Sequence, residues 1–534
     1  MESTNKKKRY EFDEVFQLVR TMGPYQIILY FGVCMLQFPM AFQFGQSIFA
    51  LGTPKFHCSD GNSTWCEANK CCNNCTNYVF DGPFTSTVSE WNLLCDRAYL
   101  GASIQSSYFA GMLVGSIVSG WIADSFGRRT SIFLSLAFII LFGVGSSFAN
   151  SIPLLIFLRF FVGFSLAGCM LTQFVYIVEM VGPNKRTHAG KAQGSFWKFG
   201  AWAVVLLAYF VRDWRLHILI GSLSGIVFFF FFCVFPETPR WSLAHDHIER
   251  AQAVLMKCGA KKNKTLDTQA LRELLEYVRE DGKQIKDGDF HKRYNPLDLV
   301  RTPKLRKWTI IVCYNWFVVS LVYFGFDLYT TQLPGSIYLN YFLMNLIDIP
   351  VIGVVWFTVH RYGRKIPYCV YMFVVVVCSF VILGLPKEYE ITITTMAILG
   401  RSFVWSEFHN IYLITTELYP TVVRNTAMGL GSMTARIGAM LSPYIVMVAQ
   451  LPGLSLTLPV TIFGVLALIA SVVTLWLPET ICANMHQTIE EAESAKEDFW
   501  ASCFRKNRDE CKDANIDMPK ITPLKSHTEH VTAL

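Results

Sequence analysis

Charged residues are scarce in this chain, and their scarcity excludes most classes of soluble protein. Only 16% of its 534 residues are charged and 52% are apolar, which is typical of a polytopic membrane protein. Period-2 alternation of the β-barrel kind is absent, so the spans are expected to be helices. The sequence also lacks Gly-x-Ser-x-Gly, His-Glu-x-x-His and a Walker phosphate loop. We therefore expect neither an enzyme nor an ATP-driven pump, and no cofactor or metal site.

Apolar segments long enough to cross a bilayer, at about 20 residues each, occur twelve times. They lie at residues 25–51, 99–123, 130–149, 152–179, 190–210, 215–235, 308–333, 336–359, 367–385, 391–417, 424–450 and 455–478. Lysine and arginine are concentrated in alternate loops, which predicts that both termini are cytoplasmic. The first segment is too long for a cleavable signal peptide. The net charge of +7 follows from this topology and does not predict nucleic-acid binding.

One large loop, residues 52–98, is expected outside the cell. It holds six cysteines, namely Cys58, Cys66, Cys71, Cys72, Cys75 and Cys95, and two glycosylation sequons that begin at Asn62 and Asn74. An oxidised, glycosylated ectodomain is the natural interpretation. The spacing of Cys72 and Cys75 also fits a zinc or redox motif, which is less expected outside the cell, and the pairing of the six stays open.

An internal repeat sets the domain organisation. Three short motifs occur twice, and the two copies of each are separated by nearly the same number of residues along the chain. The pairs are GWIADSFGRR with HRYGRK, EMVGPNKR with ELYPTVVR, and PETP with PET. This regular separation predicts a duplicated six-helix unit. The expected parts are an N-terminal arm (1–24), a first half (25–235), a cytoplasmic linker (236–307), a second half (308–478) and a cytoplasmic tail (479–534). Helical stretches in the linker are expected to cap the inner face.

Two six-helix halves joined by a charged loop resemble the major facilitator superfamily, whose halves rock around a midplane site. Asp124, Gly127, Arg128 and Arg129 match the family's loop motif, in which a carboxylate and arginines clasp neighbouring helix ends. In the second copy a histidine replaces the acid, so a weaker clasp is expected there. The resemblance implies gating or structural roles for this motif, for its repeat and for the intramembrane arginines, together Glu179, Arg186, Gly363, Arg364, Glu417, Arg424, Arg159 and Arg401.

Four stretches resemble the organic ion transporters, which carry organic cations, carnitine-type zwitterions and organic anions. They are EFDEVFQLVRTMGPYQ, VSEWNLLCD, FPETPRW and TELYPTVVRNTAMG. The resemblance covers residues 10–480. It implies a plasma-membrane secondary carrier of organic cations or zwitterions that works by alternating access, with an unspecified coupling ion. An organic-anion carrier is the first alternative, and a receptor-like sensor or channel on the same fold is the second.

Charges inside the membrane are the candidate binding residues, because they are costly there. The position of Arg436 resembles a selectivity residue that is arginine in anion and carnitine-type carriers, and its guanidinium suits a substrate carboxylate. Glu407 is expected at a similar depth, where it either holds a substrate amine or neutralises Arg436. Asp327 and Lys198 are further candidates, although Asp327 is also compatible with an outer vestibule. Asp348 is expected to partner a nearby cation.

Aromatic rings attract quaternary ammonium groups, and four candidates are Tyr323, Phe324, Trp197 and Trp405. Tyr323 and Phe324 match an aromatic pair of the resembling family, although each ring is more often core or interfacial belt. The chain ends in HVTAL, where Thr532 and Leu534 fit a PDZ-binding ending. An uninvolved tail is equally compatible with the polar run before it.

Overall fold

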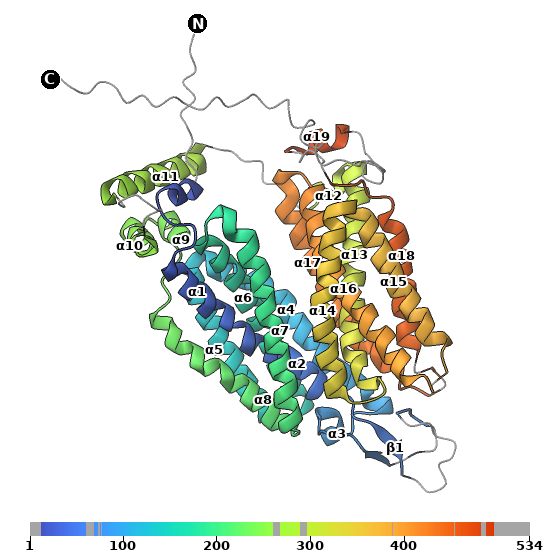
Figure 1. The fold of residues 1–534 in the computed structure, drawn as a ribbon. Helices are drawn as coiled ribbons and strands as arrows, with labels where there is room; N and C mark the ends of the chain where they lie inside the picture. Colours follow the sequence, from blue (N-terminus) through green and yellow to red (C-terminus); the bar gives the residue numbers. More distant parts are fainter. Residues whose placement is uncertain are drawn as a thin grey trace, which may run out of the picture.

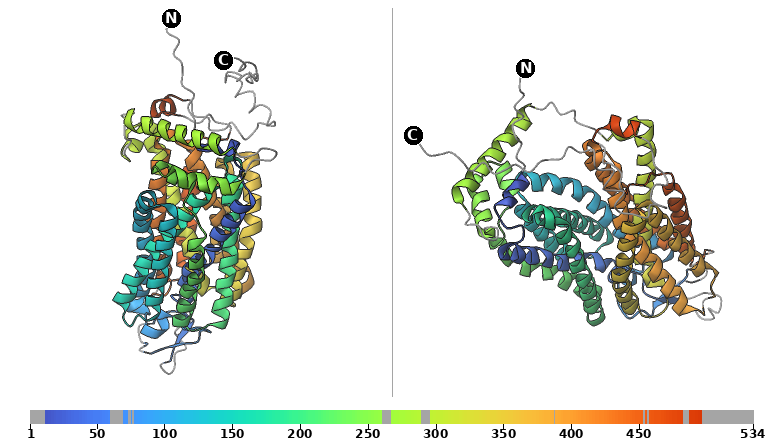
Figure 2. Two further views of the ribbon diagram at one scale, coloured as in Figure 1. Left: turned by 90° about the vertical axis from the view of Figure 1, so that its left-hand side faces the viewer. Right: turned by 45° about the horizontal axis from the view of Figure 1, so that its top comes forward.

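The computed structural model of the chain consists mainly of long helices (Figure 1). It describes residues 12–59, 69–72, 75, 77–259, 267–288, 296–386, 388–452, 454–455, 457–481 and 487–495. The helices form two bundles that lie side by side, and Figure 2 shows the same division from two other directions.

The first bundle contains seven α-helices and one 3-10 extension. They are α1 (Pro24–Met35), α2 (Gln37–Phe49), α4 (Ala98–Phe126), α5 (Arg128–Ser147), α6 (Ile152–Met180), α7 (Pro183–Phe210), α8 (Trp214–Leu223) and η3 (Ser224–Cys233). Several begin with proline in the first turn, where a missing N–H costs nothing. A side chain on Gly111 of α4 would collide with the carbonyl of Phe160 on α6, so glycine permits this close helix packing.

The second bundle repeats this pattern. It contains α13 (Pro303–Tyr329), η4 (Thr330–Gln332), α14 (Ile337–Tyr362), α15 (Lys365–Gly384), α16 (Glu390–Leu418), α17 (Thr421–Val448) and α18 (Leu458–Thr474). Inside it, the indole N–H of Trp316 donates to Thr415 at 3.0 Å, which links α13 to α16. Buried apolar side chains of both bundles form one continuous core.

Eight described helical segments are long and apolar enough to cross a membrane by length and composition. They lie at Pro24–Phe49, Cys95–Phe126, Arg128–Ser147, Ile152–Met180, Trp214–Cys233, Pro303–Gln332, Ile337–Tyr362 and Lys365–Gly384. Three other long helices carry four of the intramembrane charges predicted from the sequence: α7 carries Lys198, α16 carries Arg401 and Glu407, and α17 carries Arg436. Helix α18 is a shorter apolar helix of 17 residues. The count of twelve spans and the predicted domain limits stay predictions.

Helices outside the two bundles cover one end of the molecule (Figure 1). They are η1 (Phe12–Gln17), α9 (Pro239–Ala244), α10 (Ile248–Cys258) and α11 (Thr268–Gly288) by the first half, with α12 (Asp298–Arg301) and α19 (Ile489–Ser494) by the second. Some of these helices share a separate cluster of buried apolar side chains, which includes Phe12, Val15, Leu255 and Leu271. The segment between the halves therefore packs against the N-terminal arm through a small core of its own.

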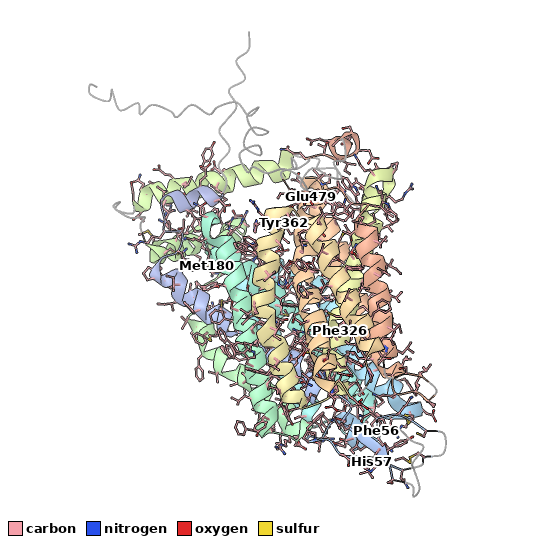
Figure 3. The ribbon with its side chains drawn as sticks, turned by 45° about the vertical axis from the view of Figure 1, so that its right-hand side comes forward. Phe56, His57, Met180, Phe326, Tyr362 and Glu479 are labelled. Carbon is pink, nitrogen blue, oxygen red and sulfur yellow. A yellow bond between two sulfur atoms is a disulfide. The ribbon has the colours of Figure 1, made fainter. Side chains whose placement is uncertain are left out.

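The opposite end carries the cysteine-rich loop, with β1 (Phe56–Cys58) and β2 (Tyr78–Phe80) paired antiparallel, α3 (Thr87–Trp91) and η2 (Cys95–Arg97). Figure 3 labels Phe56 and His57 at this end and Tyr362 and Glu479 at the other. Disulfides join Cys58 to Cys75 and Cys71 to Cys95, and Cys72 is also disulfide-bonded. The predicted sites Cys66, Asn62 and Asn74 lie outside the described residues.

Glu90 of α3 fastens this loop to α8. Its carboxylate accepts the indole N–H of Trp214 at 2.6 Å and a guanidinium N–H of Arg215 at 2.6 Å. The hydrogen bond from Arg215 holds the pKa of Glu90 below its usual value. The loop and the adjoining end of the first bundle are thus joined by a charge-assisted contact.

Candidate functional site

A network of charged and polar groups closes one end of the first half. Gly127 ends α4 at φ +100°, and a side chain there would collide with Glu237. Glu237 accepts the first backbone N–H of α5, from Arg128, at 2.9 Å. The Arg128 guanidinium lies 3.2 Å from Glu179, which also accepts the Thr238 hydroxyl at 2.6 Å. The network thus joins α4, α5, α6 and the PETP segment.

The second half repeats this network with its own residues. Gly363 takes φ +98°, and Glu479 accepts the Arg364 backbone N–H at 2.8 Å. The Arg364 guanidinium donates twice to Glu417, at 2.9 and 3.0 Å, and Thr480 donates to Glu417 at 2.6 Å. The repeat seen in the sequence is therefore a repeat of atomic contacts. Because both networks close within their own halves, each half is braced at this end independently of the other.

The two copies differ at the acid of the loop motif. Asp124 lies 3.0 Å from Arg128, although its side chain is 75% exposed, so this contact contributes little. In the second half His360 stands at the matching position. Arg129 donates from Nη2 to the carbonyl of Phe232 at 2.6 Å and thereby ties α5 to η3.

Arg186 of α7 anchors the N-terminal arm. It donates two hydrogen bonds to Asp13, at 2.6 and 2.8 Å, and a third from Nε to the carbonyl of Val178. The Arg186 hydrogen bonds hold the pKa of Asp13 below its usual value. Arg424, at the matching place in the second half, lies half-buried in the first turn of α17.

Four of the intramembrane charges meet in one network. Arg401 donates from Nε to Asp327 at 2.8 Å, from Nη1 to Asp348 at 2.5 Å and from Nη2 to the Tyr323 hydroxyl at 3.1 Å. Lys198 of the first half forms an ion pair with the same Asp348 oxygen. Two cations and two carboxylates make the network neutral, and all four side chains are at most 9% exposed. The structure thus places Asp327 in this network.

Arg159 and Arg436 differ from those cations, because neither forms a salt bridge with a carboxylate among the described residues. Arg159 donates to Gln46 at 3.3 Å and lies 4.8 Å from the ring of Tyr108. Arg436 is half-buried, and the only described hydrogen-bond acceptor within reach is the sulfur of Met112, at 3.8 Å. Arg436 is therefore a half-buried cation that lacks a strong partner within the described chain.

Glu407 is not brought together with Arg436. Its side chain is fully buried and accepts the amide N–H of Asn410 at 3.0 Å on the same helix. Tyr368 and Cys369 of α15 lie near it. The second oxygen has no described hydrogen-bond partner. Glu407 thus faces the packed interior of the second half, away from the other candidate residues.

The four predicted aromatic residues belong to a continuous chain of ring contacts between the halves. Phe44 of α2 lies 5.5 Å from Trp197 and 5.6 Å from Phe324, measured between ring centres. Tyr323 lies 5.0 Å from Phe324 and 5.0 Å from Trp405. The ring of Trp405 is also 4.5 Å from the Lys198 ammonium. Aromatic faces therefore border the charge network, as cation recognition requires.

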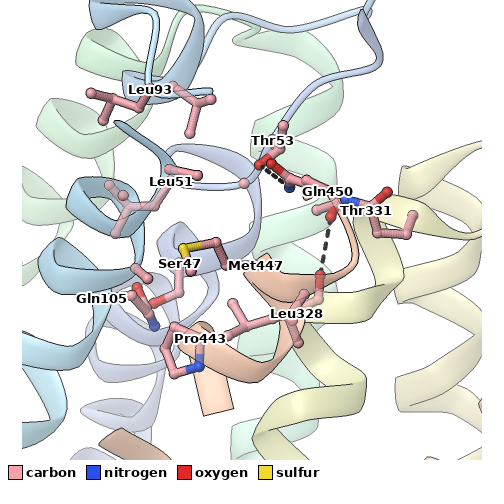
Figure 4. Close-up of a pocket in the computed structure, with 17 residues that line it drawn as sticks. Ser47, Leu51, Thr53, Leu93, Gln105, Leu328, Thr331, Pro443, Met447 and Gln450 are labelled. Atoms are coloured by element: carbon pink, nitrogen blue, oxygen red, sulfur yellow. Dashed lines mark hydrogen bonds between the residues drawn. The ribbon is translucent and has the colours of Figure 1, made fainter. Parts of the chain in front are cut away.

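A pocket lies where the two halves meet near the cysteine-rich loop (Figure 4). Gln450, which follows the end of α17, donates to Thr53 at 3.1 Å across its rim. Ser47 and Gln105 line both this pocket and a smaller one that reaches Asp327. These pockets lead toward the charge network from the loop side. The described residues contain no cluster of three or more potential metal ligands.

Two groups of functional residues were not singled out from the sequence. Glu237 and Glu479 cap the helices that follow the glycine turns, and the repeated Pro-Glu-Thr motif was their only signal. Gln46 and Tyr108, which contact Arg159, carry no sequence signal that distinguishes them from other buried residues.

Comparisons with known proteins agree on the kind of molecule. The profile of a family described as "Sugar (and other) transporter" matches residues 31–494. The chain is 30% identical to an organic cation transporter-like protein of Drosophila melanogaster, over 97% of this chain and 98% of that protein. It is 33% identical to solute carrier family 22 member 16 of Homo sapiens, over 78% of this chain and 71% of that protein.

Solved structures show the same fold at low sequence identity. The xylose transporter XylE from E. coli, in an inward open conformation, matches with a TM-score of 0.61 and 16% identity, covering 88% of this chain and 98% of that one. Another XylE structure, described as a major facilitator superfamily proton:xylose symporter, matches with a TM-score of 0.54 and 15% identity over 91% and 99% of the two chains.

Proposed function

The chain belongs to the organic ion transporters of the major facilitator superfamily, and on this premise we propose that it carries small zwitterions with a carboxylate and a positively charged nitrogen. Carnitine and related amino-acid derivatives have this chemistry. The proposed mechanism is alternating access of the two halves around the midplane charges, at the plasma membrane.

The single observation that carries this proposal is that Arg436 has no carboxylate partner among the described residues. An arginine at mid-membrane costs about 3 kcal/mol on insertion scales, and the described chain offers it no carboxylate. A substrate carboxylate supplies the missing partner, with two parallel hydrogen bonds in a site of low dielectric. The binding energy of the substrate then offsets a cost that is already present in the empty protein.

The positive end of the substrate has an aromatic surface to meet. Trp405 is half-buried, with Tyr323 5.0 Å away, and the face of such rings attracts quaternary ammonium groups. Asp348 and Asp327 border these rings but are paired with Arg401. A cation that lacks a carboxylate leaves Arg436 uncompensated, so zwitterions are favoured over simple cations.

An organic anion is the second candidate, because Arg159 and Arg436 both lack a carboxylate partner among the described residues. Uptake of three labelled compounds in cells expressing the chain separates these candidates: carnitine, tetraethylammonium and benzoate. We expect carnitine to accumulate fastest. Benzoate as the fastest substrate overturns the zwitterion proposal in favour of the anion carrier, and uptake of none of the three excludes both. Repeating the assay without sodium, and at different pH, identifies the coupling ion.

We also propose that both termini are cytoplasmic and that the loop at residues 52–98 is extracellular. The disulfides Cys58–Cys75 and Cys71–Cys95 support an oxidising location for this loop. We expect antibody to reach a terminal epitope only after permeabilisation. Enzymatic deglycosylation is expected to lower the mass of the protein, and Asn62→Gln is expected to reduce this loss of mass. The opposite accessibility contradicts this topology.

The C-terminal residues lie outside the described part of the chain, and we propose that they bind a PDZ scaffold through Thr532 and Leu534. Deletion of the last three residues is expected to shorten retention at the surface of a polarised cell while the KM of uptake stays the same. Unchanged retention contradicts a scaffold role for this ending.

A further inference from the structure

The Lys198 ammonium crosses from one half of the molecule to the other. Lys198 belongs to α7 of the first half, and its described contacts all lie in the second half. They are the ion pair with Asp348, a hydrogen bond to Asn345 at 3.4 Å and the ring of Trp405 at 4.5 Å. No described hydrogen bond or ion pair of this ammonium is made within its own half. Its position is therefore set by the second half.

Asp348 is fixed independently of Lys198. The guanidinium of Arg401 holds Asp348 at 2.5 Å and is itself anchored by Asp327 and Tyr323, all within the second half. These groups of the second half comprise two carboxylates and one guanidinium, so they carry a net charge of −1 when Lys198 is absent. They form a preorganised site for one cation, which Lys198 occupies in this structure.

The surroundings of the Lys198 ammonium have the composition of an organic-cation site. One carboxylate and one half-buried indole face are the groups that recognise ammonium and quaternary ammonium ligands. A flexible four-carbon stem brings the lysine into this site. When the halves move apart at α7 and α14, the stem withdraws and leaves Asp348, Asp327 and Arg401 with an uncompensated negative charge in a buried site, which is unfavourable.

We propose that Lys198 is a built-in occupant of the substrate's cation subsite, and that the positively charged nitrogen of the substrate displaces it from Asp348 and Trp405. This inference rests on the proposed function, because it assigns the nitrogen of the zwitterion to one end of a site whose other end is Arg436. The displaced ammonium moves along its flexible stem toward water. The ion pair between the halves is broken only when a substrate nitrogen replaces it, so the loaded protein reorients and the empty protein is held.

Binding to the purified full-length protein tests the displacement. The variant Lys198→Met removes the competing ammonium, and Lys198→Arg is the matched control that keeps it. A tethered group competes at millimolar effective concentration or more, so we expect Lys198→Met to lower the Kd of labelled carnitine about tenfold or more. The Kd of benzoate, which has no positive nitrogen, is expected to stay the same. Weaker or unchanged carnitine binding by Lys198→Met overturns the inference.

A second variant covers the case in which Lys198→Met does not fold, because that change leaves a net charge of −1 in the membrane. The double variant Lys198→Met, Asp327→Asn restores neutrality and keeps Asp348 and Trp405. It is expected to bind carnitine more tightly than the single variant Asp327→Asn, and equal or weaker binding overturns the inference. If the unaltered protein neither binds nor carries carnitine, the proposed function fails. If it binds carnitine and the lysine variants bind no tighter, only the displacement fails.

Transport provides an independent readout in proteoliposomes. Because the empty protein is held by the ion pair, carnitine entry is expected to be at least about tenfold faster with unlabelled carnitine inside, which corresponds to about 1.4 kcal/mol. Lys198→Met is expected to lose this dependence, whereas Lys198→Arg retains it. If internal carnitine does not change the rate of carnitine entry by the unaltered protein, the Lys198–Asp348 ion pair does not hold the empty protein, and this part of the inference is wrong.

Discussion

Replacement of Arg436 by glutamine tests the proposed carboxylate site most directly. The change removes the charge and keeps a polar side chain, although a shorter one. Arg436 has no carboxylate partner among the described residues, so no described buried anion is left unpaired. We therefore expect Arg436→Gln to fold and reach the membrane in normal amounts.

The size of the effect on transport follows from the bond that is lost. A hydrogen bond to a charged group contributes about 1.5–3 kcal/mol, and each 1.36 kcal/mol corresponds to a factor of ten. The KM for carnitine is thus expected to rise about 10- to 150-fold. The KM for tetraethylammonium, which has no carboxylate, is expected to change much less or to fall, because a nearby positive charge is removed.

Arg401→Gln is the matched control for this argument. Arg401 holds both Asp327 and Asp348, and removing one partner of a buried ion pair costs about 3–5 kcal/mol. This variant is expected to be lost from the membrane, as measured by surface biotinylation beside uptake. Equal loss of carnitine and tetraethylammonium uptake in Arg436→Gln, or its disappearance from the surface, would refute the reasoning and show a structural charge.

Two further predictions concern the ends of the molecule. Gly127→Ala is expected to lower stability by about 1–3 kcal/mol, because φ +100° with ψ 155° is a backbone conformation that essentially only glycine adopts, and by more from the collision with Glu237. Gly120→Ala, whose added methyl group would meet a Leu171 carbon at 4.0 Å, is the matched control. Equal melting temperatures of the two variants in detergent contradict this prediction. The pKa of Glu90 is lowered by Arg215, so its contribution is complete above the usual pKa and lost as the pH falls through the lowered value. Protease cleavage of the loop is expected to increase below about pH 4.5 in the native protein, and this pH response should be absent in Glu90→Gln.

The sequence predicted the family and the all-α fold, and both are confirmed by the family profile and by the fold of XylE. The repeat was visible because glycine, arginine and glutamate recur in register. Their contacts were less visible: Glu237 and Glu479 act through backbone N–H groups of other helices. A capping interaction between segments far apart in sequence leaves no local pattern, so only the motif and not its partner was apparent.

The intramembrane charges show a second limit of the sequence. Depth along a helix follows from the rise per residue, and on that basis the sequence predicts a similar depth for Glu407 and Arg436. Rotation about the helix axis decides which groups meet, and each residue adds about 100°. Trp405 and Glu407 are two residues apart and point to nearly opposite sides of α16. Trp405 borders Lys198, whereas Glu407 lies near Tyr368.

The two cations of the proposed substrate site are in opposite states before substrate arrives. Arg436 lacks a strong partner and gains one from a carboxylate, whereas Lys198 is already paired and must be displaced. A simple anion therefore satisfies Arg436 but leaves the Lys198–Asp348 pair between the halves intact. Benzoate is expected to inhibit carnitine uptake competitively while accumulating no faster than in cells that lack the protein.

A zwitterion satisfies both conditions, because its carboxylate pairs with Arg436 and its nitrogen replaces Lys198. In Lys198→Met the ion pair with Asp348 between the halves no longer exists. The halves can therefore move apart when an anion has bound to Arg436. Labelled benzoate is then expected to accumulate in cells that express Lys198→Met and to remain excluded in cells that express Lys198→Arg. Rapid benzoate uptake by the unaltered protein would contradict this order of events, since it would show that the halves move while Lys198 still holds Asp348.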